Sequence, residues 1–125
     1  MARGGLQHVS LETRHADAEA EARFWTLLGF TRIAPPASLG ESRAWWFQAP
    51  DGVTQIHLLF EDDDPVAPPA GHVAVVVDGW IATLAALTAA GFDIEDRAAH
   101  WDAPRAYVRT PGGHRVELMA AAPPA

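Results

Sequence analysis

The chain has 125 residues, of which 49% are apolar and 20% charged, a composition typical of one globular domain with its own core. The net charge is −7 and arginine is the only basic residue type, so no nucleic-acid surface is indicated, and the lack of cysteine excludes disulfides and thiolate chemistry. No apolar run is long enough for a membrane span and the N-terminus lacks the apolar core of a signal peptide, so we expect a soluble, cytoplasmic protein without membrane contact.

The first half of the chain predicts a strand, a helix and three further strands. The first strand is "LQHVSL" (6–11), and the helix that follows is expected to be capped by Asp17 and to end at Gly29. The apolar stripe of this helix is predicted from four residues: Ala20, Phe24, Leu27 and Leu28. Further strands are indicated by "RAWWFQA" (43–49) and "TQIHLLF" (54–60), joined by a Pro-Asp-Gly turn.

The second half repeats this order after an acidic, proline-rich segment, "EDDDPVAPPA" (61–70), which predicts an extended linker. A strand at "GHVAVVV" (71–77) precedes a helix for which Asp78 is the expected cap and Gly91 the expected end. The stripe of this helix is predicted from Trp80, Leu84 and Leu87. Strands at "RAYVRT" (105–110) and "HRVELM" (114–119) are joined by a Pro-Gly-Gly turn.

The two halves of the chain form an internal repeat. His72 follows His8 by 64 residues and Glu117 follows His57 by 60, and the order of elements between them is the same. The sequence therefore predicts an α+β fold of two tandem βαβββ modules. Each helix covers one face of its sheet, which leaves the opposite face uncovered, and we expect the strands to curl into a mixed sheet, a cup or half-barrel, with the helices outside.

Four ionisable residues share the uncovered faces. Side chains alternate across a strand, so His8 lies opposite Val9 and Leu11 and His57 lies opposite Ile56 and Leu58. The same parity puts His72 and Glu117 opposite the apolar face of the second module. Three imidazoles and one carboxylate make a ligand set for a divalent metal such as zinc, nickel, cobalt, manganese or iron(II).

The motifs "HVSLET", "FWTLLGF", "TQIHLLF", "GHVAVVVD" and "RTPGGHRVELM", in this order, resemble the vicinal oxygen chelate superfamily of glyoxalases, bleomycin resistance proteins and extradiol dioxygenases. The resemblance covers residues 6–120. It implies one domain over residues 1–125, with modules at about 5–62 and 71–121 and a linker at about 61–70. It also implies a homodimer, and a metal held by His8, His57, His72 and Glu117.

Three functions remain open. The resemblance favours a glyoxalase-like lyase or isomerase, in which the metal chelates a small oxygenated substrate and Glu117 transfers the proton. Glyoxalase I-like enzymes commonly have glutamate where this chain has His57, so a standard lactoylglutathione lyase is not expected. A small extradiol-type dioxygenase and a metal-free, bleomycin-resistance-like binding protein are the alternatives.

Several other residues are candidates for substrate binding, each with a structural alternative. In the cluster of Trp45, Trp46 and Phe47 both strand parities occur, so at least one ring faces the uncovered side and the rest are core. Trp101, beside His100, lies in a loop that could rim a pocket. Tyr107 and Arg109 share a parity with Arg105 and could meet an anion. His15 and His114 are expected to be solvated.

Overall fold

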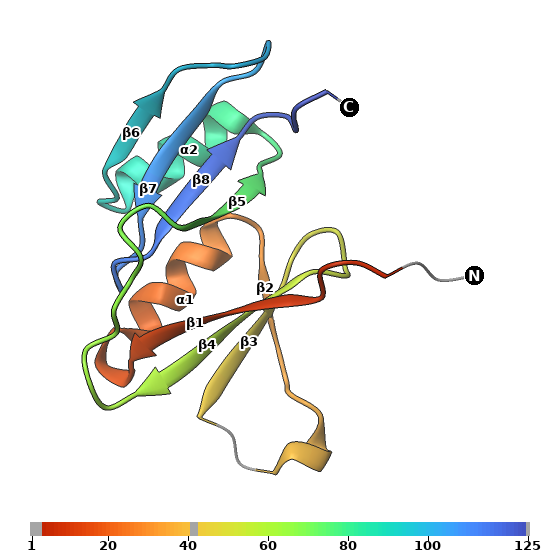
Figure 1. Ribbon diagram of the computed structural model, residues 1–125, viewed down its shortest axis with the longest axis vertical. Coiled ribbons are helices and arrows are strands. Elements are labelled where there is room, and N and C mark those ends of the chain that lie inside the picture. Colours follow the sequence, from red (N-terminus) through yellow and green to blue (C-terminus); the bar gives the residue numbers. More distant parts are fainter. Residues whose placement is uncertain (1–3, 41–42, 125) are drawn as a thin grey trace. The chain divides into compact units, whose positions relative to one another are not determined.

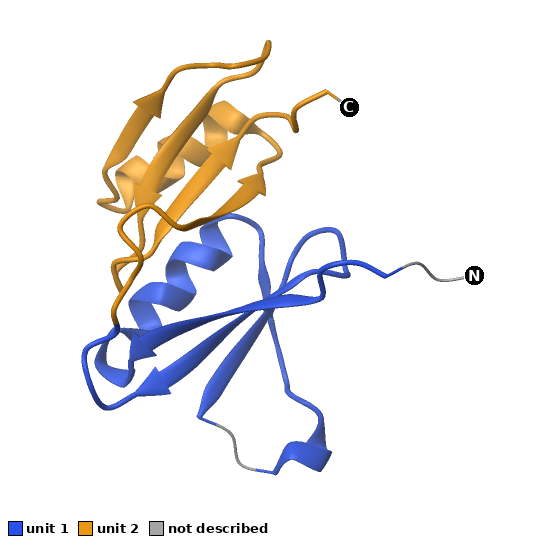
Figure 2. Cartoon of the chain, in the orientation of Figure 1, with its two compact units in different colours: residues 1–65 blue, residues 66–125 orange. Residues whose placement is uncertain are grey.

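The chain divides into two compact units, residues 1–65 and residues 66–125 (Figure 2). The computed structural model describes residues 4–40 and 43–124, so residues 1–3, 41–42 and 125 of the predicted domain 1–125 lie outside the described part. The boundary between the units falls inside the predicted linker 61–70, in which no helix or strand follows Glu61.

Unit 1 has the order strand, helix, strand, strand, strand (Figure 1). Its elements are β1 (His8–Arg14), α1 (Ala18–Leu27), β2 (Thr31–Ile33), β3 (Ala44–Gln48) and β4 (Gln55–Glu61), with short 3-10 turns at His15–Asp17 and Ala37–Leu39. The strands form one sheet in the order β1-β4-β3-β2. β1 and β4 are parallel, and the other neighbours are antiparallel.

Unit 2 repeats this arrangement. Its elements are β5 (His72–Val76), α2 (Trp80–Ala89), β6 (Ile94–Arg97), β7 (Arg105–Arg109) and β8 (Arg115–Met119). The sheet order is β5-β8-β7-β6, again with the first and last strands parallel. The predicted βαβββ modules are confirmed: the described residues form two four-stranded mixed sheets, which are not closed into a barrel.

The apolar parity of each sheet forms the core, as predicted. In unit 1, Ile56, Leu58 and Phe60 of β4 are at most 6% exposed, and they share a face of the sheet with Phe47 of β3. α1 lies over this face (Figure 1) and contributes the buried rings of Phe24 and Trp25. In unit 2 the corresponding buried residues are Val77, Leu87, Ala106, Val108, Val116 and Leu118.

The buried stripe of α1 differs from the prediction. Ala20 is exposed, and the buried residues are Ala18, Glu21, Phe24, Trp25 and Leu28. Their spacing of three or four residues is still that of one helix face. The large indole of Trp25 decides which face is covered, because burying it removes far more apolar surface from water than burying Ala20 would.

The predicted cap of α2 is also corrected. Its N-cap is Gly79, in the left-handed conformation at φ 60°, and the carbonyl of Asp78 accepts a hydrogen bond from the Thr83 hydroxyl. Asp17 does occupy the N-cap position of α1, although its side chain makes no capping hydrogen bond. In the described part of the chain, neither helix has the length and apolar character that a membrane crossing requires.

Candidate functional site

Unit 1 contributes a stack of three rings on its uncovered face. The His57 imidazole lies between the His8 imidazole and the Trp46 indole, with ring centroids 4.0 Å apart on both sides. The rings come from three neighbouring strands, because β4 lies between β1 and β3. Trp46 is the direct partner of His57 in the antiparallel register, whereas His8 lies diagonally across the parallel pair.

His57 is the most enclosed of the three histidines predicted to bind metal. It is 5% exposed, because β4 is an interior strand and a ring covers each face of the imidazole. Burial, with a smaller contribution from the charge of His8, lowers the pKa of His57 from 6.5 to about 4. The ring is therefore neutral at pH 7, the form that binds a metal ion. Its Nε2 lies 2.8 Å from Oε1 of Gln55.

Unit 2 contributes an imidazole and a carboxylate at the equivalent places. Nε2 of His72 lies 3.0 Å from Oε1 of Glu117, and the Tyr107 ring is 5.4 Å from the His72 ring. Tyr107 pairs directly with Glu117, as Trp46 pairs with His57. In each unit the internal repeat thus places a histidine on the first strand, an ionisable group on the last strand and an aromatic ring on the strand next to it. Glu117 is 7% exposed on interior strand β8, while His72, on edge strand β5, is more open.

Arg105 holds the second oxygen of Glu117. Its Nη1 is 3.4 Å from Oε2 of that carboxylate, its Nε donates to the carbonyl of Ala98 at 2.7 Å, and its Nη2 is 2.8 Å from Nε2 of His100. Arg105 is itself only 9% exposed. It therefore fixes the carboxylate in a geometry that leaves Oε1 directed to His72. The sequence reasoning noted Arg105 only by its parity and gave it no part in orienting Glu117.

The donor atoms suit a divalent metal. Neutral imidazole nitrogens and a carboxylate oxygen are borderline ligands for first-row ions. Two ligands bound to one ion at about 2.0–2.2 Å stand roughly 3 Å apart, which is the separation of the His72 and Glu117 donors. Each unit supplies two such donors, and in neither unit do three or more of the described His, Asp and Glu side chains form a metal-ligand group.

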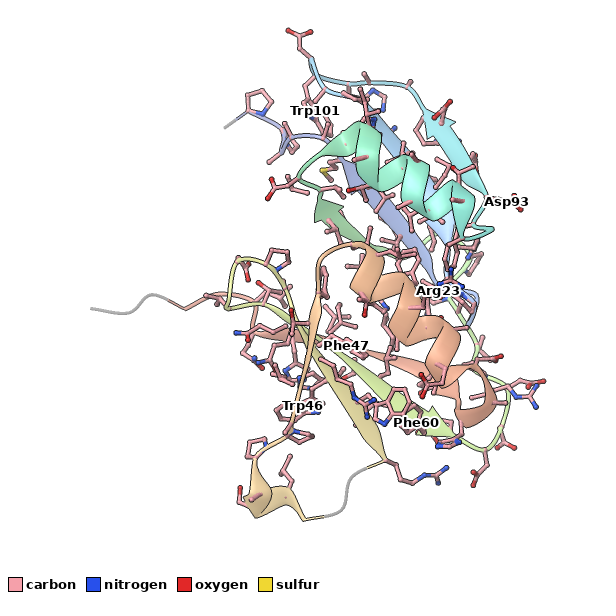
Figure 3. All side chains as sticks on the ribbon, turned by 180° about the vertical axis from the view of Figure 1, so that it is seen from behind. Arg23, Trp46, Phe47, Phe60, Asp93 and Trp101 are labelled. Carbon is pink, nitrogen blue, oxygen red and sulfur yellow. The ribbon has the colours of Figure 1, made fainter. Side chains whose placement is uncertain are left out.

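The aromatic cluster of β3 divides between the two faces of the sheet. Figure 3 labels Trp46 and Phe47; Phe47 is 1% exposed and lies in the core, and Trp46 is on the uncovered face against His57. Trp45 shares the helix-covered parity with Phe47, packs edge-on against Phe60 and carries the Arg32 guanidinium 3.7 Å above its ring. Of the three predicted substrate-facing rings, Trp46 alone lies beside the candidate ligands.

The loop that contains Trp101 (Figure 3) is tied to the C-terminal end of unit 2. The Trp101 indole donates to the carbonyl of Ala121 at 2.9 Å, and its neighbour His100 contacts Arg105. The loop thus touches the group that orients Glu117. His114, predicted to be solvated, is instead 8% exposed, and its backbone N–H donates to the Thr110 hydroxyl. Within unit 1, His15 is exposed as expected.

The comparisons with known proteins agree with this architecture. A family model described as "Glyoxalase/Bleomycin resistance protein/Dioxygenase superfamily" matches residues 5–118. A protein from Bacillus anthracis assigned to the glyoxalase family is 26% identical, with a TM-score of 0.78 over 95% of this chain and 96% of that chain. No protein among the curated sequences matches the chain.

Two more distant structures share the fold. The fosfomycin resistance protein FosX from Listeria monocytogenes, solved with Mn(II) and 1S,2S-dihydroxypropylphosphonic acid, is 16% identical with a TM-score of 0.69, over 97% of this chain and 95% of that one. The oxidase ChaP-H2 is 15% identical with a TM-score of 0.74, over 97% and 96% of the two chains. One fold therefore carries several activities among these relatives.

Proposed function

The chain belongs to the Glyoxalase/Bleomycin resistance protein/Dioxygenase superfamily, and from that premise we propose that it is a metal-dependent lyase or isomerase for a small oxygenated substrate. His8, His57, His72 and Glu117 are the proposed ligands of one divalent ion. The proposal requires the donors of both units to reach that ion, within one chain or between the two copies of a homodimer.

One observation carries the proposal: each unit presents two donors on the uncovered face of its sheet, at positions related by the internal repeat. A single histidine on a sheet surface is usually a solvated residue. Here His57 and Glu117 are buried polar groups on interior strands, where an unsatisfied polar group is costly. Each of the two sheets has one such group at an interior position, and a ligand explains this better than packing does.

A divalent ion bound there would polarise the substrate oxygens and stabilise the negative charge that develops on them. Glu117 is the proposed base: its carboxylate takes the proton from the carbon next to the carbonyl and returns it to the neighbouring carbon in an isomerase. Arg105 supports this role because it holds Oε2 of Glu117, while Oε1, which lies 3.0 Å from Nε2 of His72, is the oxygen proposed to take the proton. Trp46 forms an apolar wall that fixes the His57 ring.

The decisive experiment is elemental analysis of protein purified without chelator, together with proton exchange. The expected result is about one divalent ion per site, lost on treatment with chelator. The metal-loaded protein should also incorporate deuterium from D₂O next to the carbonyl of hydroxyacetone. Glu117→Gln should abolish that exchange while the circular dichroism spectrum is unchanged. His15→Ala, which changes an exposed histidine away from the proposed ligands, should leave metal content and exchange unchanged.

Other outcomes would point to the alternatives. Oxygen consumption with a catechol, dependent on iron(II) or manganese, would indicate the extradiol-type dioxygenase. The absence of any stoichiometric metal would indicate the sequestering protein and contradict the proposal. Exchange at the wild-type rate in the Glu117→Gln variant would remove Glu117 from the role of base.

A further inference from the structure

A cavity of about 460 Å³ lies in unit 2, where β7 ends and β6 begins. Its lining residues include Phe92, Tyr107, Arg109 and Arg115. A pocket of this size accommodates a small organic molecule. The polar residues in the lining determine which class of molecule binds.

The two arginines are direct cross-strand partners. Arg109 on β7 pairs with Arg115 on β8 in the antiparallel register, so two guanidinium groups start from adjacent points on the same face of the sheet. Like charges placed directly opposite each other destabilise a sheet. The chain has 16 acidic residues against 9 basic ones, so an acidic partner for either arginine would be easy to supply. The pairing of two arginines therefore requires an explanation.

No carboxylate neutralises this pair among the residues that the structure describes. Arg109 donates to two backbone carbonyls, of Gly113 at 3.0 Å and of Pro69 at 3.4 Å, and Arg115 lies over the Tyr107 ring at 4.7 Å from its centroid. Neither forms an ion pair within 4.0 Å in the described ranges. The charge of both groups is therefore available to a ligand.

The nearby acidic residues do not fill this role. Glu95 and Asp93 also line the cavity, but Glu95 forms its ion pair with Arg97, at 2.9 Å. Asp93 is exposed beside the start of β6 (Figure 3), and no ion pair joins it to either arginine. Glu117, on the same sheet face, is held by Arg105 and His72.

One lining residue of the cavity lies beside two of the candidate metal ligands. Tyr107 forms part of its wall, pairs directly with Glu117, and lies 5.4 Å from the His72 ring. A molecule in the cavity with its anionic end on the arginines would therefore extend along Tyr107 toward the carboxylate.

We infer that Arg109 and Arg115 form a binding site for an oxyanion, the carboxylate, phosphate or phosphonate of a small molecule. A guanidinium presents a planar fork of donors that matches such a group, and two forks from adjacent strands would take up its charge and relieve their own repulsion. That the substrate itself carries this oxyanion rests on the proposed function. The binding of the anion does not rest on it.

The test uses inorganic phosphate as the probe and metal-free, chelator-treated protein. Phosphate should bind in isothermal titration calorimetry and raise the unfolding temperature, against a chloride control of equal ionic strength. Arg115→Gln should weaken phosphate binding about tenfold or more, the effect of losing one charge-assisted contact. Arg23→Gln, which changes an exposed arginine of α1 (Figure 3), should leave it unchanged.

Two further measurements make the outcome decisive. Without phosphate and at low salt, Arg115→Gln should unfold at the same temperature as the wild type or a higher one, because it removes a repulsion. Glu117→Gln should still bind phosphate, so a failure of the metal proposal leaves the anion site standing. The inference is overturned if phosphate binds no better than chloride, or if Arg115→Gln and Arg23→Gln bind phosphate equally. Acetate tested in parallel separates carboxylate from phosphate preference.

Discussion

The imidazole of His57 lies parallel to the indole of Trp46, with 6° between the ring planes. On its other side His8 stacks at an interplanar angle of 11°. A ring stacked between two others cannot tilt about its Cβ–Cγ bond without losing both contacts. Packing thus sets the direction of its nitrogen lone pair in the metal-free protein. Surrounding groups orient metal ligands in the same way.

Replacing Trp46 should therefore weaken metal binding. Trp46→Leu removes the indole face from His57 and is expected to lower metal affinity about tenfold, as loss of an orienting neighbour does. The loss of the stacked pair should also cost about 1 kcal/mol of unfolding free energy. Metal titration followed by calorimetry, together with urea unfolding of the metal-free protein, measures both effects.

Trp45→Leu is the matched control for that experiment. Trp45 is on the same strand but on the helix-covered face, where it contacts Phe60 and Arg32. Its replacement should lower stability and leave metal affinity at the wild-type value. Equal losses of affinity in the two variants would mean that the fold, and not the stack on His57, determines binding.

Acid should destabilise the metal-free protein through His57. Its pKa is about 4 in the folded chain against an ordinary value of 6.5, so the unfolded chain binds the proton more readily. The stability that the neutral ring provides is complete above pH 6.5 and is lost as the pH falls toward 4. The full loss, reached below pH 4, is on the order of 3 kcal/mol.

A His57→Gln variant isolates this effect. Urea unfolding at pH 7.5, 6 and 4.5 should show a wild-type midpoint that falls more steeply than that of the variant, which has no imidazole to protonate. If both midpoints fall in parallel, other groups account for the acid sensitivity and His57 is not held neutral by burial.

Much of the fold was accessible from the sequence because periodicity and repetition report directly on burial. The alternation in "TQIHLLF" identified both the core face of β4 and the place of His57 on the other face. The stripe of α1 was misassigned at Ala20 because a small apolar residue fits the helical period as well as Trp25 does but gains little from burial.

The surroundings of the candidate ligands were less accessible, because they depend on cross-strand register. Arg105 reaches Glu117 from a neighbouring strand, and Arg115 meets Arg109 by pairing between β7 and β8. Neither relation has a fixed spacing in the sequence. The repeat offered one usable signal: with Trp46 opposite His57, the equivalent residue Tyr107 should stand opposite Glu117.

The two helix-ending glycines should respond differently to the same substitution. Gly29 and Gly91 are related by the repeat and have φ of 91° and 93°, a region that side chains with a Cβ rarely adopt. Gly91→Ala should cost about 1 kcal/mol from the backbone alone, since its Cβ would meet no atom within 4 Å. A Cβ on Gly29 would lie 3.2 Å from Cγ of Pro50.

Gly29→Ala should therefore be the more destabilising of the two. The crowding against Pro50 should cost roughly a further 0.5–1 kcal/mol. Urea unfolding of both variants under identical conditions makes the comparison. Equal losses would indicate that the Pro50 turn moves aside at no cost.

Removal of Arg105 should affect both stability and the carboxylate that it holds. Arg105→Gln leaves Glu117, which is 7% exposed, without its cationic partner and also breaks the bond to the Ala98 carbonyl, so we expect a loss of roughly 3 kcal/mol. Arg97→Gln is the control, because the Arg97–Glu95 pair is largely exposed and should be worth less than about 1 kcal/mol.

Arg105→Gln should also lower metal affinity, because the Glu117 carboxylate is no longer held in place. Arg105→Lys keeps the charge but not the planar set of donors, so it should recover part of the stability. It should not restore metal affinity, because one ammonium group cannot bond the Ala98 carbonyl and orient Glu117 at the same time. Urea unfolding and metal titration of the three variants separate these effects, and a Lys variant with wild-type metal affinity would show that charge alone positions the carboxylate.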